Sequence, residues 1–486
     1  MNEKNRFSKL LKHLMSAAEV KNYTLAQELQ YDVSYISKWT GGQMIPSEKY
    51  ASKILKGISE CIVMRCSDEA AEGLMEEYRV DSREYLKQAV LDNLEAEYSY
   101  VRELQNSSGT DTTPAMQFRA ELKLAQFVSK MRHPVLRRVS DLDIVGVFDI
   151  LAMAREYQLQ ITEANNKHVP TGKWYQDVHY SMVIDVNKDR LDYAHDMIFL
   201  VDMLDRNRCI DFSLYGNTKA SGKAVFVVGT DYMISGMLIS KDLCVSVVTS
   251  ENPEDCKTMY RNMKGMCSQE DLLFRKTSMR EVLLKHEYVH GLFALRQQWV
   301  VGHLTEHFLP EDLFEEITAQ LDKGEEGTPP LEELRSIHKI ARNVVENFKI
   351  NLLLYRTAFY NLVVDNELDF FNVKIKLTQK QIIRCLEHFI ELCRDHSGLE
   401  IKMVPGRLIS NMDYGTKHCV FLSDTISHIR LDGEYNNMYV VNRRDMKEAF
   451  TKTFYEFWEN RSDTLITDKQ TIIANIEHVL SGIRGE

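Results

Sequence analysis

Hydrophobic and polar positions change their spacing along this 486-residue chain. In the first part apolar residues recur at intervals of three and four, which predicts amphipathic helices. Helices are expected through residue 105 and again over 115–165, where Pro134 interrupts the pattern. The segment NSSGTDTTP at 106–114 is typical of a turn or linker. From about residue 170 onward, short apolar runs that predict strands alternate with helical patterns, so an α/β body should follow an all-α region.

The α/β part contains the order β-α-β-β-β-α twice. In the first pass we expect strands at 178–186, 209–216, 223–239 (a pair) and 243–250, with helices at 191–207 and 253–266. In the second pass we expect strands at 370–377, 399–406, 417–431 (a pair) and 438–443, with helices at 378–395 and 444–460. Val225-Phe226 and Val420-Phe421 occupy equivalent places. Two similar modules are therefore predicted, and a groove between such modules is a common place for a small ligand.

Residues 21–47 have the pattern of two short helices joined by a tight turn. Leu25, Ala26 and Leu29 fit the inner face of the first helix, and Asp32 can cap the second. Ile36 and Trp39 recur on the inner face of the second helix. Gly41-Gly42 ends that helix, and Pro46 suits the start of the next. A short exposed helix with small polar residues on its outer face fits the major groove of DNA.

This segment resembles the Cro/C1-repressor (XRE) helix-turn-helix family over about the first 60 residues. The matching positions are Leu25-Ala26, Ser34-Tyr35-Ile36-Ser37-Lys38-Trp39, Gly42 and Pro46-Ser47. The resemblance implies base readout by the start of the second helix and a phosphate contact at the start of the first. The implied DNA-binding residues are Asn22, Val33, Ser34, Tyr35, Ser37 and Lys38. The family's usual turn glycine is Gln30 here, and Val33 replaces a common glutamine, so its contact would be apolar.

Charge is unevenly distributed along the chain. The net charge is −11, yet residues 1–60 carry nine lysines and arginines against six aspartates and glutamates, which makes them +3 and the rest about −14. An acidic body would be repelled by phosphates, so DNA contact should stay on the N-terminal segment.

The chain shows neither a signal peptide nor an apolar run of the roughly 18–20 residues that a membrane span needs. Its nine cysteines form no CxxC pair. Free thiols in a cytoplasmic protein are therefore expected, with a redox switch through Cys61 and Cys66 as the alternative.

The paired modules are faintly similar to the two halves of phospholipase-D-like domains, some of which are non-catalytic sensors. Catalysis in that family needs an H-x-K-x4-D motif. The nearest match is His428-Ile429-Arg430, where arginine replaces lysine and Asp432 is too close. The resemblance therefore implies catalytically inactive modules.

A competing signal is the H-E-x-x-H pattern of His286-Glu287-Tyr-Val-His290. On one helix the two histidines would share a face and could bind zinc, with Glu287 activating a bound water. His303 or His307 could add a third ligand. The alternative is chance, with His286 packed in an interface of a helical connector.

Phe454, Tyr455, Phe457 and Trp458 gather on a predicted amphipathic helix. At helical spacing such a cluster is usually core, and ligand stacking is the alternative. The acidic stretch 322–333 is most simply a solvated loop.

The predicted organisation is a helix-turn-helix domain (1–62), a helical linker or dimerisation region (63–168), a first α/β module (169–277), a helical connector (278–365) and a second module (366–486). We expect a cytoplasmic, homodimeric regulator that binds double-stranded DNA, is not an enzyme and needs no cofactor. Its body would sense a small molecule or a protein partner. The alternatives are a DNA-binding zinc metallopeptidase and a repressor of a mobile element controlled by a protein partner.

Overall fold

The computed structural model describes residues 5–78, 80, 82–107, 116–137, 142–163, 175–187, 192–321, 331–395, 398–406, 408, 418–431, 437–460 and 464–484. The chain divides into two compact units, Met1–Arg190 with Arg206–Gln269, and Leu191–Asp205 with Glu270–Glu486. The predicted linker at 106–114 and acidic loop at 322–333 fall largely outside the described residues, and Asp432 does so entirely. None of the helices in the described ranges has the length and apolar character needed to cross a membrane.

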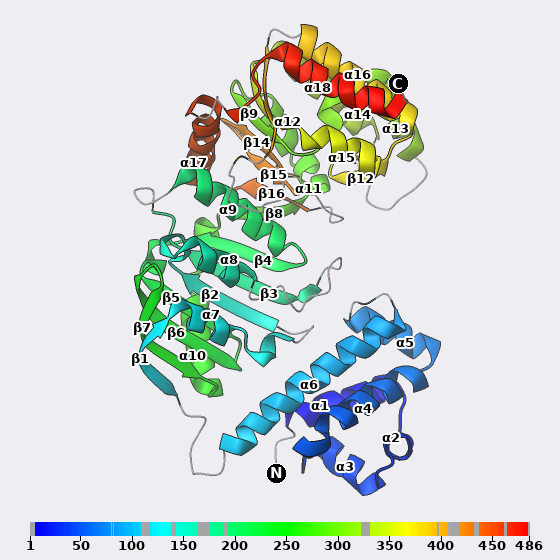
Figure 1. Ribbon diagram of the computed structural model, residues 1–486, viewed down its shortest axis with the longest axis vertical. Helices are drawn as coiled ribbons and strands as arrows, with labels where there is room; N and C mark the ends of the chain where they lie inside the picture. Colours follow the sequence, from blue (N-terminus) through cyan, green and yellow to red (C-terminus); the bar gives the residue numbers. More distant parts are fainter. Residues whose placement is uncertain are drawn as a thin grey trace. The chain divides into compact units, whose positions relative to one another are not determined.

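The N-terminal region is helical (Figure 1), and its helices share one hydrophobic core. Its elements are α1 (Arg6–Ala17), α2 (Asn22–Leu29), α3 (Val33–Gly41), η1 (Glu48–Tyr50), α4 (Ala51–Arg65), α5 (Asp68–Tyr78) and α6 (Arg83–Ser107). The long helix α6 packs along α1 and α4. Leu86, Val90 and Leu94, one helical turn apart, are each fully buried there. Helices α5 and α6 therefore complete the core that the first four helices begin.

The first sheet has seven strands in the order β1-β7-β6-β5-β2-β3-β4. Its strands are β1 (Gln117–Lys123), β2 (Leu142–Phe148), β3 (Tyr175–Ile184), β4 (Ile210–Gly216), β5 (Lys223–Val228), β6 (Tyr232–Ser240) and β7 (Leu243–Ser250). The connecting helices are α7 (Leu124–Met131), η2 (Pro134–Arg137), η3 (Ile150–Ala152), α8 (Arg155–Glu163), α9 (Tyr193–Arg206), η5 (Thr218–Ala220) and α10 (Pro253–Lys264). Strands β2, β3 and β4 are parallel neighbours, and the remaining pairs are antiparallel.

The second sheet also has seven strands, in the order β13-β10-β9-β14-β15-β16-β8. They are β8 (Phe274–Ser278), β9 (Gln297–Val301), β10 (Ile350–Tyr355), β13 (Leu399–Val404), β14 (Cys419–Ser423), β15 (His428–Arg430) and β16 (Asn437–Val441). Its helices are η6 (Gln269–Asp271), α11 (Met279–Leu284), α12 (Glu287–Leu292), η7 (Glu306–Phe308), α13 (Glu311–Leu321), α14 (Leu331–Asn347), α15 (Thr357–Asp365), α16 (Gln379–Asp395), α17 (Arg444–Tyr455), the π-helical turn η8 (Glu456–Asn460) and α18 (Lys469–Arg484). A separate hairpin joins β11 (Glu367–Phe370) to β12 (Val373–Lys376).

The two sheets have the same topology. In each, the second, third and fourth strands along the chain are parallel neighbours, and the first, fifth, sixth and seventh extend the sheet by antiparallel pairing. Val225 pairs with Val147 in the first sheet, and Val420 pairs with Val300 in the second. The repeated element order therefore corresponds to a repeated three-dimensional arrangement.

Three secondary-structure predictions were wrong. Residues 115–165, expected to be helical, contain β1 and β2, and the expected helical connector at 278–365 contains β9 and β10. Strands β2, β9 and β10 are short apolar runs, and the spacing of apolar residues in such a run fits a buried helix as well as a strand. Strand β1 is mostly exposed and has no apolar alternation. Segment 370–377, expected to open the second module, lies instead around the β11–β12 hairpin, where Phe371 and Asn372 have positive φ and form the two-residue turn.

Candidate nucleic-acid interface

The turn between α2 and α3 is held by backbone conformation and by aromatic packing. Gln30 has φ 57° and thus the left-handed conformation that glycine adopts most easily. The Tyr31 backbone N–H donates to the Ala26 carbonyl at 2.9 Å. The Tyr31 ring lies 5.5 Å from the buried Trp39 ring. The inner faces predicted for both helices are confirmed, since Leu25 and Ile36 are fully buried.

The second helix begins with the predicted cap. The Asp32 carboxylate accepts a hydrogen bond from the Ser34 backbone N–H at 2.9 Å, at the positive end of the helix dipole. The hydrogen bonds from Ser34 lower the pKa of Asp32 below its ordinary value. The carboxylate therefore stays charged at neutral pH and fixes where α3 starts.

The outer face of α3 presents all five of the residues predicted to contact DNA from this helix. Ser34, Ser37 and Lys38 are exposed, and so are the larger side chains Val33 at 37% and Tyr35 at 43%. The Lys38 ammonium lies 5.8 Å from the centre of the Tyr35 ring. This face thus offers two hydroxyls, one cation, a phenol and one apolar side chain to a partner.

The sixth predicted residue, Asn22, lies beside this face. Its side-chain amide donates to the Ser37 hydroxyl at 3.3 Å, which joins the start of α2 to the middle of α3. A surface concavity here is also lined by Lys12 of α1 and by Lys21, both exposed cations. Sequence reasoning missed these two lysines, although their positive charge beside the helix-turn-helix was a usable signal. A cationic rim around a polar helix face suits contact with phosphates.

Helix α3 ends at a position that favours glycine. Gly42 has φ 78° and caps the helix in the left-handed conformation, whereas Gly41 is helical and a Cβ added to it would meet no atom within 4 Å. We expect Gly42→Ala to lower the free energy of unfolding by about 1–2 kcal/mol, because a Cβ is strained there. The matched Gly41→Ala should be neutral or stabilising by up to about 1 kcal/mol. Thermal unfolding of both variants measures this, and an equal loss from both would contradict it.

The H-E-x-x-H residues do not lie on one helix. Helix α12 begins at Glu287, and His286 precedes it with φ 54°, so the premise of the zinc hypothesis is wrong. His286 and His290 are both exposed, which also excludes His286 as a packed interface residue. The Glu287 carboxylate accepts from the Arg275 guanidinium at 2.6 Å. In the part of the chain that the structure describes, no three histidine, cysteine, aspartate or glutamate side chains group around a metal position.

Downstream of that motif, a buried ionic cluster contains several residues that the sequence had suggested for chemistry. Arg430, the lysine-replacing residue of the phospholipase-D-like match, is fully buried and makes two hydrogen bonds to Glu306 at 2.7 and 2.9 Å. Its Nη2 also donates to the Tyr288 hydroxyl at 2.9 Å, and the Tyr288 hydroxyl lies 2.9 Å from His307 Nε2. His307 and Glu306 are thus held inside the core and do not reach His286 or His290 as metal ligands.

Comparison with protein-family models gives no match for this chain, and comparison with curated proteins gives none either.

Proposed function

We propose that this protein is a sequence-specific DNA-binding transcriptional regulator that reads DNA with α3. The observation that carries the proposal is the exposed outer face of an Asp32-capped helix, with Ser34, Ser37 and Lys38 pointing away from the core. An α-helix of this kind fits the major groove, where hydroxyl and ammonium groups pair with base edges. Val33 would contact a thymine methyl, and Asn22 a phosphate.

The charge distribution supports contact through this region alone. Lys12 and Lys21 line the concavity beside the face and Lys38 lies on the face itself, whereas the chain outside residues 1–60 carries a net charge of about −14. Phosphates would attract the first surface and repel the rest. A two-fold DNA site would be read by a homodimer, with one α3 in each half-site. The α/β body would set the spacing of the two helices and would change it when an effector binds.

Ser37→Ala and Lys38→Ala should each weaken binding to a selected DNA site by roughly 1–3 kcal/mol if the side chain contacts a base. The site is first selected from random duplexes with the full-length protein, and affinities are then measured by fluorescence anisotropy at several salt concentrations. If Lys38 contacts a base, Lys38→Ala reduces the ratio of the affinity for the selected site to the affinity for random DNA. If Lys38 contacts a phosphate, the same variant weakens binding to both and reduces the salt slope by about one.

The matched control is Lys123→Ala, which removes one exposed cation from β1, outside the helical region. It should leave affinity for the selected site unchanged. Failure to enrich any duplex sequence, or equal decreases in affinity for Lys123→Ala and Lys38→Ala, would reject α3 as the reading helix.

A further inference from the structure

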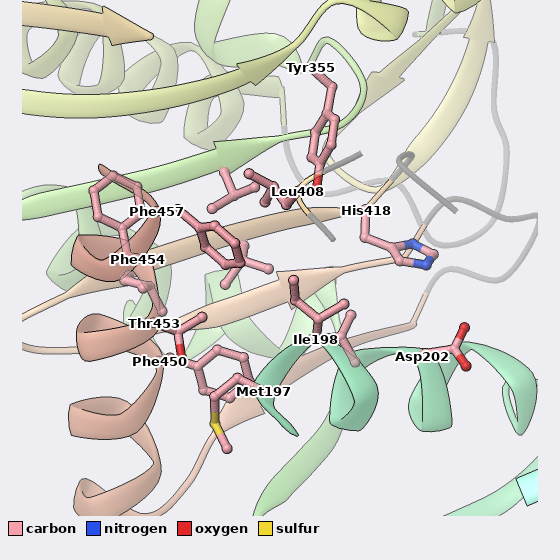
Figure 2. A pocket seen from close by; sticks show the side chains of 14 residues that line it. Met197, Ile198, Asp202, Tyr355, Leu408, His418, Phe450, Thr453, Phe454 and Phe457 are labelled. Carbon is pink, nitrogen blue, oxygen red and sulfur yellow. The ribbon is translucent and has the colours of Figure 1, made fainter. Parts of the chain in front are cut away.

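A cavity of about 80 Å³ lies within the second unit, on the face of the second sheet opposite its large helical core (Figure 2). Its walls are the strands β9, β10 and β14, the helices α9 and α17 with η8, and the residues Leu408 and His418 outside these elements. All of its lining residues belong to the second unit. Strand alternation explains the two faces: Trp299 and Phe421 point into the core, and their neighbours Val300 and Val420 line the cavity.

Most of the cavity wall is apolar. Phe450, Phe454 and Phe457 line one side, and Met197 and Ile198 of α9 line another (Figure 2). Two members of the aromatic cluster noted in the sequence, Phe454 and Phe457, therefore face this space while being 2% exposed. A wall of this kind favours an apolar ligand and penalises burial of a charge.

One polar group in the wall, the Tyr355 hydroxyl, has no hydrogen-bond partner among the residues that the structure describes. Tyr355, the last residue of β10, is 9% exposed, and its hydroxyl points into the cavity (Figure 2). Among the described residues nothing accepts from or donates to this hydroxyl, and burial raises the pKa of Tyr355 above its ordinary value. The hydroxyl is therefore a neutral group that can donate a hydrogen bond to a molecule in the cavity.

The other polar groups of the wall are already engaged. The Thr453 hydroxyl donates to the Tyr193 carbonyl at 2.8 Å, and His418 Nε2 lies 3.5 Å from an Asp205 carboxylate oxygen. Asp202, which lies near His418 at the end away from the phenylalanines, also has an interaction partner. The carboxylates of Asp202 and Asp205 at this end of the cavity would repel an anionic ligand. Because both carboxylates already have interaction partners, the site does not need a cationic ligand to neutralise them.

We infer that this cavity binds a small, uncharged, mainly apolar molecule that accepts one hydrogen bond from the Tyr355 hydroxyl. Aryl or short-chain ketones, esters and lactones have this chemistry. The binding site stands on its own geometry, and only its role as an effector site depends on the proposed function. Helix α9, one wall of the cavity, is also the chain segment that connects β3 to β4 of the first sheet.

Binding is tested by ¹⁹F NMR on the full-length protein without DNA, so failure of DNA binding leaves this test intact. The three probes are 4′-fluoroacetophenone, which carries a carbonyl acceptor, fluorobenzene, which lacks it, and 4-fluorobenzoate, which is anionic. We expect the ketone to bind most tightly and the benzoate most weakly. Tyr355→Phe should weaken ketone binding about five- to tenfold and leave fluorobenzene unchanged.

Two further variants make the result specific. Ile198→Trp fills the cavity and should abolish binding of both neutral probes, and circular dichroism checks that it remains folded. Tyr360→Phe removes a hydroxyl from α15, where the side chain is 41% exposed, and should change nothing. The proposal is overturned if neither neutral probe binds at millimolar concentration, if the benzoate binds more tightly than the ketone, or if Tyr355→Phe and Tyr360→Phe have the same effect.

Discussion

Glu306→Gln is expected to lower the free energy of unfolding of the second unit by about 3–5 kcal/mol, because it removes the carboxylate that accepts two hydrogen bonds from the buried Arg430 guanidinium and leaves only the longer ion pair with Asp369 at 3.6 Å to offset that charge among the described residues. The Arg430 side chain is fully buried and that of Glu306 is 1% exposed. Burial by itself would raise the pKa of the Glu306 carboxyl, but Arg430 and His307 lower it by a larger amount. The net pKa is therefore below its ordinary value, and the carboxyl group is ionised. Glutamine keeps the shape of glutamate but cannot neutralise a guanidinium.

Urea unfolding followed by tryptophan fluorescence measures the effect, since the Trp299 ring packs 5.0 Å from the His307 ring in the same cluster. The control is Glu315→Gln, which breaks an ion pair with Arg335 in which both side chains are 46% exposed. That pair should contribute less than about 1 kcal/mol. The double variant Glu306→Leu/Arg430→Met removes both charges and should be destabilised less than Glu306→Gln. Equal destabilisation by Glu306→Gln and Glu315→Gln would contradict the argument.

Acidification from pH 6.5 toward 4 is expected to destabilise the second unit. Burial lowers the pKa of His307 and of His338 to about 4. Burial, and to a smaller extent the positive charge of Arg430, lowers the pKa of His428. As pH falls, these histidines therefore become protonated in the unfolded chain at a higher pH than in the folded protein. Their contribution to stability is fully present above the unfolded pKa of about 6.5 and falls with pH by at most about 1.4 kcal/mol per unit for each histidine.

One histidine titrates with the opposite sign, outside this window. Burial by itself would lower the pKa of His303, but the interactions with Cys419 and Asp369 raise it by a larger amount. The net pKa of His303 is therefore above its ordinary value. Its contribution is lost as pH rises through the folded pKa, and below pH 6.5 it is constant. The decrease in stability as pH falls from 6.5 therefore comes from the four histidines of the second unit whose pKa is lowered, His307, His338, His388 and His428. Carboxylates with a lowered pKa, such as Glu306, add to the decrease near pH 4.

His338→Phe tests this assignment. The His338 ring stacks on Phe314 at 3.8 Å, and neither ring nitrogen has a hydrogen-bond partner among the described residues. Phenylalanine preserves the stacking and removes one titrating group, so the pH slope of stability between 6.5 and 4 should become shallower. His290→Gln, at an exposed position, should leave the slope unchanged. Denaturant midpoints at half-unit pH steps give the slopes, and an unchanged slope in His338→Phe would reject the assignment.

The sequence predicted the structure well where it depends on residues that are close to one another along the chain. Asp32 caps α3, Gly42 ends it, and Ile36 and Trp39 point inward, all as expected. Each feature follows from helix periodicity or from the conformational freedom of one residue. The strands of the repeated modules were found by the same means wherever turn residues bounded them.

Predictions failed where a short apolar run depended on distant partners. INLLLY at β10 is largely apolar on both faces because both are buried: Leu352 and Leu354 belong to the core, and Leu353 and Tyr355 are buried on the opposite side. A run of that length fits a buried helix equally well until its neighbours are known. The edge strand β1 has five exposed residues in succession and hence no apolar alternation to detect.

The sequence by itself determined the two short helices α2 and α3 with the turn between them, the exposed face of α3 and the repeated order of elements, because local conformation and periodicity control these. Only the tertiary structure decided what Arg430 and Tyr355 do. Arg430 meets Glu306 across 124 positions of the chain, and the Tyr355 hydroxyl faces a cavity whose walls come from β9, β10, β14, α9, α17, η8 and two residues outside them. Such contacts depend on how strands and helices pack, which residue spacing does not specify.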